Sequence, residues 1–135
     1  MRTHTHYSSS FFELDLIPFS AAYNASWQFL TVNSTFPDNH MPAMWSDYKV
    51  QVLVDEDASL SKTYTAIFKW LPGKIKSNET DLIIFFSGHG LASSDGKSKY
   101  ILPSDADPDL LSKTALSRSE LFDQIINLNP KSVTM

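Results

Sequence analysis

Residues 81–90, DLIIFFSGHG, decide the fold of this chain. The run Leu82–Phe86 is short and wholly apolar, which is typical of a strand inside a parallel sheet that is covered on both faces. It leads straight into Ser87-Gly88-His89-Gly90, where two glycines let the backbone turn tightly around a histidine. A lone histidine is more often a surface or hydrogen-bonded core residue. Sites in open parallel sheets form at the carboxyl ends of strands, so this position favours a functional role for His89.

The segments before this run predict a strand followed by a helix. Tyr48–Val54 (YKVQVLV) is rich in β-branched residues and alternates, so it predicts a strand. Asp57 or Ser59 can cap the helix that follows, and Pro72-Gly73 ends it. Its apolar stripe consists of Leu60, Tyr64, Ile67, Phe68 and Leu71. Strand, helix and strand in succession predict a βαβ unit with parallel strands.

The segments after His89 predict further strands and a second helix. Asp95-Gly96 predicts a turn, and Lys99–Leu102 predicts a short extended piece. A capping box of Ser117 and Glu120 opens a helix, which ends at Asn129-Pro130. The apolar face of that helix consists of Leu121, Phe122, Ile125 and Leu128, and KSVTM (131–135) then predicts the start of a further strand.

The N-terminal third has a weaker pattern. Residues 1–10 predict an unstructured lead, and the alternation in residues 11–17 (FFELDLI) predicts a half-exposed strand or extended arm. Pro18 opens a predicted helix to about Leu30, because Phe19, Tyr23, Trp27 and Leu30 recur at helical spacing. Residues 33–47 carry two prolines and no period, so they predict a loop.

Composition limits the classes of function. The chain has 135 residues, a formal net charge of −4 and no cysteine. It therefore carries no disulfide, no cysteine-bound zinc or iron–sulfur cluster and no thiol nucleophile. The mild acidity argues against nucleic acid as a partner. No apolar run is long enough to span a bilayer and no signal peptide is visible, so we expect no membrane partner and a cytoplasmic location.

No metal cofactor is predicted. The other three histidines do not have ligand spacing to His89. Residues 104–109 (SDADPD) have the opening of a calcium-binding loop, but Leu110 and Leu116 stand where an EF-hand needs glycine and glutamate. We therefore interpret this stretch as a solvated acidic loop.

Several motifs together resemble the large-subunit half of the caspase-like peptidases, peptidase family C14, in the metacaspase-type microbial branch. The similarity is clear over residues 48–135 and weak over 16–30. In chain order its motifs are SGHG (87–90), DGK (95–97), YILP (100–103), Asp105, TALS (114–117) and Glu120-Leu121. The resemblance implies a three-layer α/β/α caspase-like (caspase–haemoglobinase) fold with a mainly parallel sheet. Residues 11–135 would be an incomplete domain of this kind.

The resemblance also implies roles for the residues around His89. His89 matches the histidine of a Cys–His dyad, which takes the thiol proton and protonates the departing amine. Gly90 matches the glycine whose backbone N–H contributes to the oxyanion hole, and Ser87 and Gly88 complete the supporting loop. The nucleophile in such proteins lies at the end of the next strand, in a segment that this sequence does not contain. Ala22 stands where family members that prefer basic P1 side chains tend to carry aspartate.

The implied activity is cysteine-type endopeptidase activity on a peptide or protein substrate. It needs the remainder of the domain as a partner, no cofactor is implied, and calcium dependence stays open. One alternative is a non-catalytic caspase-like module for regulation or assembly. A weaker alternative is an α/β-hydrolase, because His-Gly after an apolar strand also forms the oxyanion side of lipases, but the G-x-S-x-G elbow is missing. We also expect the isolated chain to be marginally stable or prone to aggregation, because an incomplete sheet exposes an apolar edge.

Overall fold

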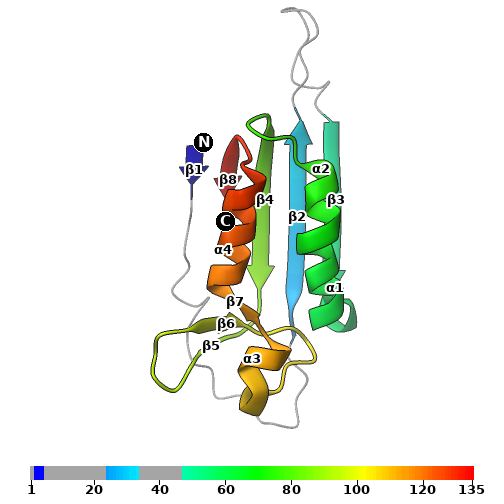
Figure 1. Ribbon diagram of the computed structural model, residues 1–135. Helices are drawn as coiled ribbons and strands as arrows, with labels where there is room; N and C mark the ends of the chain where they lie inside the picture. Colours follow the sequence, from blue (N-terminus) through cyan, green and yellow to red (C-terminus); the bar gives the residue numbers. More distant parts are fainter. Residues whose placement is uncertain (1, 5–23, 34–46) are drawn as a thin grey trace, which may run out of the picture.

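The computed structural model describes residues 2–4, 24–33 and 47–135. They form an α/β structure in which helices lie on one face of a five-stranded sheet, with a small three-stranded sheet below one end (Figure 1). The α/β class predicted from the sequence is therefore observed. The predicted strand or arm at residues 11–17 lies outside the described residues.

The main sheet is mixed. Its strands, in spatial order, are β1 (Arg2–His4), β8 (Ser132–Thr134), β4 (Thr80–Ser87), β2 (Ser26–Asn33) and β3 (Asp47–Val54). β2 is antiparallel to both β3 and β4, whereas β8 is parallel to β4 and to β1. The expectation of a mainly parallel sheet is thus wrong. β3 and β4 run in the same direction, as the βαβ prediction requires, but β2 lies between them.

The strand β2 replaces part of a predicted helix. A helix was expected from Pro18 to about Leu30, yet Ser26–Asn33 is extended, and residues 18–23 lie outside the described part of the chain. Trp27, Phe29, Thr31 and Asn33 are all buried, so the true period is two. The strand pairs along its whole length with β3 and β4, and these pairs outweigh the helical spacing of two large side chains.

The expectation of an unstructured lead over residues 1–10 is corrected at Arg2–His4, which form β1. The rest of that stretch lies outside the described residues. The expected loop over 33–47 is shortened, because Asn33 belongs to β2 and Asp47 to β3, and residues 34–46 are likewise not described.

The first covering helix follows β3 after a short turn, η3 (Asp55–Ala58). It consists of α1 (Leu60–Thr65), η4 (Ala66–Trp70) and α2 (Leu71–Lys74), which follow one another without a break. Ser59 rather than Asp57 is the N-cap, because its side chain accepts a hydrogen bond from the Lys62 N–H. Pro72-Gly73 lies inside the last turn instead of ending the helix. Of the predicted stripe, Ile67 and Leu71 are fully buried, whereas Phe68 is exposed.

The second covering helix, α4 (Arg118–Leu128), lies beside the first on the same face of the sheet (Figure 1). Ser117 caps it by accepting the Glu120 N–H at 3.1 Å, which confirms the Ser117 half of the predicted capping box, and the Glu120 carboxylate accepts the Tyr64 hydroxyl. Asn129 ends it in the left-handed conformation, with φ of 52°. Leu121 and Ile125 are its buried contacts with the core.

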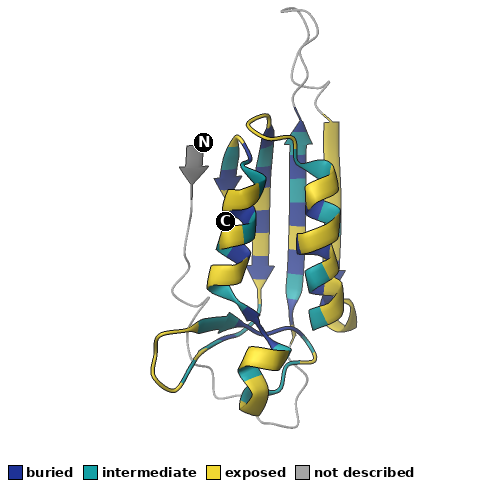
Figure 2. Ribbon diagram, viewed as in Figure 1, coloured by how far each residue is buried: buried dark blue, intermediate teal, exposed yellow. Residues whose placement is uncertain are grey.

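The hydrophobic core lies between the helices and the near face of the sheet, and the opposite face is bare among the described residues. Along β4, Leu82 and Ile84 are buried, but Ile83 is 40% and Phe85 is 55% exposed. Figure 2 shows this alternation along the strand. The prediction that Leu82–Phe86 is covered on both faces is therefore wrong for the described structure, which has two layers instead of the expected three.

A small antiparallel sheet stands at the carboxyl end of β4. It consists of β5 (Gly90–Ala92), β6 (Lys99–Ile101) and β7 (Leu116–Ser117), in that order. The predicted turn at Asp95-Gly96 joins β5 to β6, and the predicted extended piece is β6. The acidic stretch leads into η5 (Pro108–Leu110) and α3 (Leu111–Thr114), which the sequence analysis did not anticipate.

Candidate functional site

The predicted site residues Ser87, Gly88, His89 and Gly90 lie where the chain passes from the main sheet to the small sheet. Ser87 is the last residue of β4, and Gly90 is the first of β5. Gly88 and His89 make the connection, and His89 is half-buried. The four residues therefore stand at the carboxyl end of a central strand, as the sequence predicted.

Gly88 is needed because of a close approach and not because of its φ angle. A Cβ at this position would stand 2.6 Å from Cζ of Phe86 and 3.3 Å from the carbonyl oxygen of Asn24. The first distance is far below a normal contact, so any larger residue would displace an aromatic ring. Among the described glycines, the left-handed conformation belongs to Gly96 in the β5–β6 turn.

The backbone at His89 is held by the small sheet. The N–H of Leu102 donates to the carbonyl oxygen of His89 at 2.9 Å. Gly90 and Ile101 are the next opposed residues. In an antiparallel ladder hydrogen-bonded and non-hydrogen-bonded pairs alternate, so Gly90 and Ile101 form a non-hydrogen-bonded pair. The N–H of Gly90 therefore points away from β6 and takes no part in that ladder.

The strand β8 is the parallel neighbour of β4. Their register pairs Leu82 with Val133 and Ile83 with Thr134. Ser87 lies four residues after Ile83, so a chain continuing in this register brings the fourth residue beyond Thr134 opposite Ser87. The carboxyl ends of parallel strands open on the same edge of a sheet. Residues that follow β8 in this way would lie beside the His89 connection.

The acidic stretch after β6 acts as a set of helix caps. Oδ1 of Asp105 accepts the N–H of Leu60, in the first turn of α1, at 2.9 Å. Oδ1 of Asp107 accepts the N–H of Asp109 at the start of η5, also at 2.9 Å. Backbone hydrogen bonding adds to this, since the Ser104 N–H donates to the carbonyl of Ala58. Two of the carboxylates thus have structural roles that the interpretation as a solvated loop missed.

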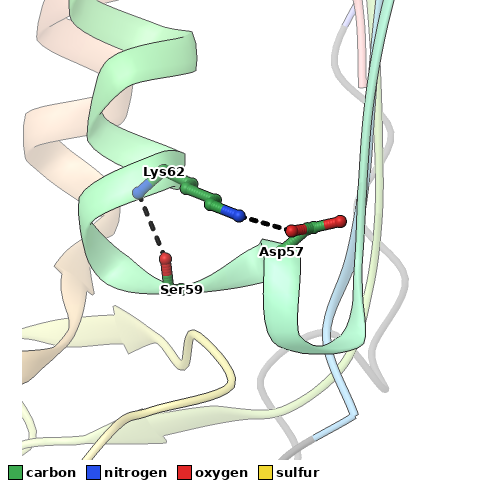
Figure 3. A network of polar contacts seen from close by, with 3 residues as sticks. All are labelled: Asp57, Ser59 and Lys62. Atoms are coloured by element: carbon green, nitrogen blue, oxygen red, sulfur yellow. Dashed lines mark hydrogen bonds and ion pairs between the residues drawn. The ribbon is translucent and has the colours of Figure 1, made fainter.

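The start of α1 carries a further polar network (Figure 3). Lys62 donates its backbone N–H to Ser59 and pairs through its ammonium group with Asp57. Both charged side chains are exposed, so the ion pair contributes little to stability. In the part of the chain that the structure describes, no group of three histidine or acidic side chains could hold a metal ion.

Two shifted pKa values lie outside the His89 connection. Partial burial and, second, the hydrogen bond to Glu120 raise the pKa of Tyr64 to about 12. The phenol donates to the Glu120 carboxylate at 2.9 Å and so links α1 to α4. In the β5–β6 turn, hydrogen bonds from the Ser93 hydroxyl and then from the Lys97 N–H lower the pKa of the exposed Asp95.

Three residues support the connection in a way that the sequence did not predict. Phe86 lies against Gly88, Trp27 packs on Phe86 with ring centroids 4.5 Å apart, and Leu102 binds the His89 carbonyl. Phe86 carried a usable signal, because it precedes a glycine at a strand end. Trp27 carried none, since its segment was predicted to be helical.

Comparisons with known proteins give no family for the chain. No family model matches it, and searches of curated proteins and of solved structures find no significant match. None of the described helices is long and apolar enough to cross a membrane.

Proposed function

We propose that the chain is the histidine-bearing part of a caspase-like cysteine endopeptidase domain, with His89 as the acid–base member of a Cys–His dyad. The observation that carries the proposal is the placement of His89 just after the carboxyl end of β4, a strand whose parallel neighbour β8 runs towards the same edge of the sheet. A thiol supplied after β8 would lie at the same edge of the sheet. The motif series from SGHG to Glu120-Leu121 supports the caspase-like assignment.

The chemistry follows from the groups at this edge. The imidazole of His89 takes the proton of an incoming thiol, and the thiolate attacks the carbonyl carbon of the scissile peptide bond. His89 then returns the proton to the departing amine. The N–H of Gly90, which points away from the ladder to β6, would bind the oxyanion of the tetrahedral intermediate. Ser87 and Gly88 support the connection without taking part in the reaction.

The thiol and the remainder of the domain come from outside these 135 residues in this proposal, because the chain contains no cysteine. The bare face of the main sheet is consistent with the need for further protein, since Val50, Val52 and Phe85 are about half exposed there. The polypeptide on its own is expected to show no cysteine-peptidase turnover.

The first test is the coding sequence after Met135. A cysteine within the next ten or so codons, followed by Ser-Gly or His-Gly, is the expected result. Another residue at that position would favour the alternative, a non-catalytic caspase-like module, and would contradict the peptidase proposal.

The second test is enzymatic. The chain extended through the rest of the domain is assayed with fluorogenic peptides that carry Arg, Lys or Asp at P1. We expect turnover that His89→Ala abolishes and that Ser94→Ala, in the exposed β5–β6 turn, leaves intact. Turnover by the unextended chain that His89→Ala blocks would overturn the proposal.

A further inference from the structure

We propose that Phe86 is a positioning residue that holds His89 in place through Gly88. This inference rests on the proposed function, because it concerns the same histidine. The ring of Phe86 lies so close to Gly88 that an added Cβ would come within 2.6 Å of Cζ and 3.2 Å of Cε2. The backbone just before His89 therefore rests directly on an aromatic surface.

The ring of Phe86 is itself fixed by the core. Its centroid lies 4.5 Å from that of Trp27, at an interplanar angle of 49°. Trp27 in turn stacks on Phe29, with centroids 5.3 Å apart and planes within 8°. Trp27 and Phe29 are completely buried, and Phe86 is 9% exposed. An aromatic row thus runs along the covered face of the sheet and reaches the connection that carries His89.

Packing, rather than hydrogen bonding, holds this row. The indole Nε1 of Trp27 is buried and has no hydrogen-bond partner within the described residues. The orientation of Trp27 therefore depends on the rings on either side of it. A change in the size of Phe86 is expected to move both Gly88 and Trp27.

The second hold on His89 is the hydrogen bond from Leu102, whose side chain is 1% exposed. The backbone at His89 is thus held at two points. Phe86 contacts Gly88 just before it, and Leu102, at the end of β6, binds its carbonyl oxygen. A fixed backbone limits the positions that the imidazole explores, and catalytic groups need placement to within about 0.5 Å. Loss of the aromatic contact should therefore loosen His89 while the strands remain paired.

The contact is tested by a double-mutant cycle on the 135-residue chain. Gly88→Ala introduces a Cβ against the ring, and Phe86→Leu removes Cζ and Cε2, the two nearest of the atoms that the Cβ would meet. We expect Gly88→Ala to accelerate amide exchange of Leu102 by about tenfold or more in the parent chain, and by much less in a chain that already carries Phe86→Leu. The matched control is Phe85→Leu on the bare face, which should leave the effect of Gly88→Ala unchanged. If Gly88→Ala accelerates amide exchange of Leu102 equally in all three chains, the proposed contact between Gly88 and Phe86 is wrong.

The positioning role needs a readout at His89 itself. In the 135-residue chain, Phe86→Leu should shift or broaden the NMR signals of the His89 imidazole, whereas Phe85→Leu should not. In the extended chain, Phe86→Leu should lower kcat and leave KM unchanged. An unperturbed imidazole signal, or an unchanged kcat in an active extended chain, would overturn the positioning role. If no extended variant shows turnover, the proposed function fails, and the imidazole signals still decide whether Phe86 positions His89.

Discussion

Along residues 83–86 of β4, the two faces of the main sheet differ in cover and not in side-chain type. Ile83 and Ile84 are adjacent on β4 and chemically identical, yet Ile83 is 40% exposed and Ile84 is 2% exposed. Phe85 and Phe86 repeat the contrast at 55% and 9%. Successive side chains of a strand point to opposite faces, so each pair of neighbours compares the two faces at the same point along the strand. The contrast shows that an apolar run makes both faces suitable for burial but does not supply what buries them.

The apolar side chains of the bare face lie next to one another across three strands. Val50 lies opposite Leu30 on β2, which lies opposite Ile83 on β4. In the next row Val52 and Phe85 flank Gln28. Contiguous apolar surface of this kind marks interaction sites or sites of aggregation. The covered face owes its burial to α1, η4, α2 and α4, so the stability of the chain should depend on one side of the sheet.

The largest expected difference is between the two isoleucines. Ile84→Ala should destabilise the chain by about 2–5 kcal/mol, because it leaves a cavity in the core. Ile83→Ala should cost less than about 1.5 kcal/mol, since Ile83 is 40% exposed and its removal leaves no closed cavity. Urea unfolding followed by circular dichroism measures both. If Ile84→Ala leaves too little folded protein, Ile84→Val and Ile83→Val give the same comparison at a smaller scale.

The next effect concerns a helix that covers the sheet. Ser117→Ala removes the acceptor for the Glu120 N–H and should lower the free energy of unfolding by about 1 kcal/mol. Ser112→Ala in α3 is the matched control, because Ser112 is exposed and caps no helix. Equal stability of the two variants in urea would show that the cap of α4 does not support the covered face.

The bare face should govern association more than stability. Val50→Thr together with Val52→Thr keeps side-chain shape and β-propensity, so the free energy of unfolding should change by only about 0.5 kcal/mol. Self-association in sedimentation velocity should fall, because the apolar surface is interrupted. Ile126→Thr, at a 61% exposed position on α4, should leave association unchanged. If the double variant associates as strongly as the parent chain, the surface that drives association lies elsewhere.

The smallest effect is the link between the two covering helices. Burial and the Glu120 contact raise the pKa of Tyr64 to about 12, so the folded state favours the neutral phenol. The stability that this provides is present below about pH 10 and is lost as the pH rises towards 12. Tyr64→Phe should therefore show a shallower loss of stability between pH 10 and 12 than the parent chain, because a phenylalanine ring has no proton to lose. Parallel pH profiles of the free energy of unfolding in the two chains would contradict this.

Much of the fold after residue 47 could be predicted from local patterns. The alternation of Tyr48–Val54, the caps at Ser59 and Ser117 and the left-handed end at Asn129 all have local physical causes. β2 was missed because Trp27 and Leu30 are spaced as on a helix, whereas its pairing partners are at least 14 residues away in sequence, the nearest pair being Asn33 and Asp47. No local pattern encodes a strand inserted between two others, so the mixed order of the sheet was missed as well.

The candidate site also has a part that could be predicted from the sequence and a part that could not. The sequence singled out His89 and its two glycines because glycines around a histidine after an apolar strand are a local signal. Its supports depend on contacts with segments that are distant in sequence. Phe86 gains its role only from the packing of Trp27, and the His89 carbonyl finds its partner at Leu102, across a hairpin.

Within residues 47–135, the sequence by itself determined the strands β3, β4, β6 and β8, the two covering helices with their N-caps, and the position of the histidine at a strand end. These features depend on hydrogen bonds and side-chain spacing within a few residues, which one segment carries alone. The tertiary structure decided the direction and order of the strands, which face of the sheet the helices cover, and why Gly88 must be glycine. Each of these depends on contacts between segments far apart in the chain, and two isoleucines side by side on β4 are identical until those contacts form.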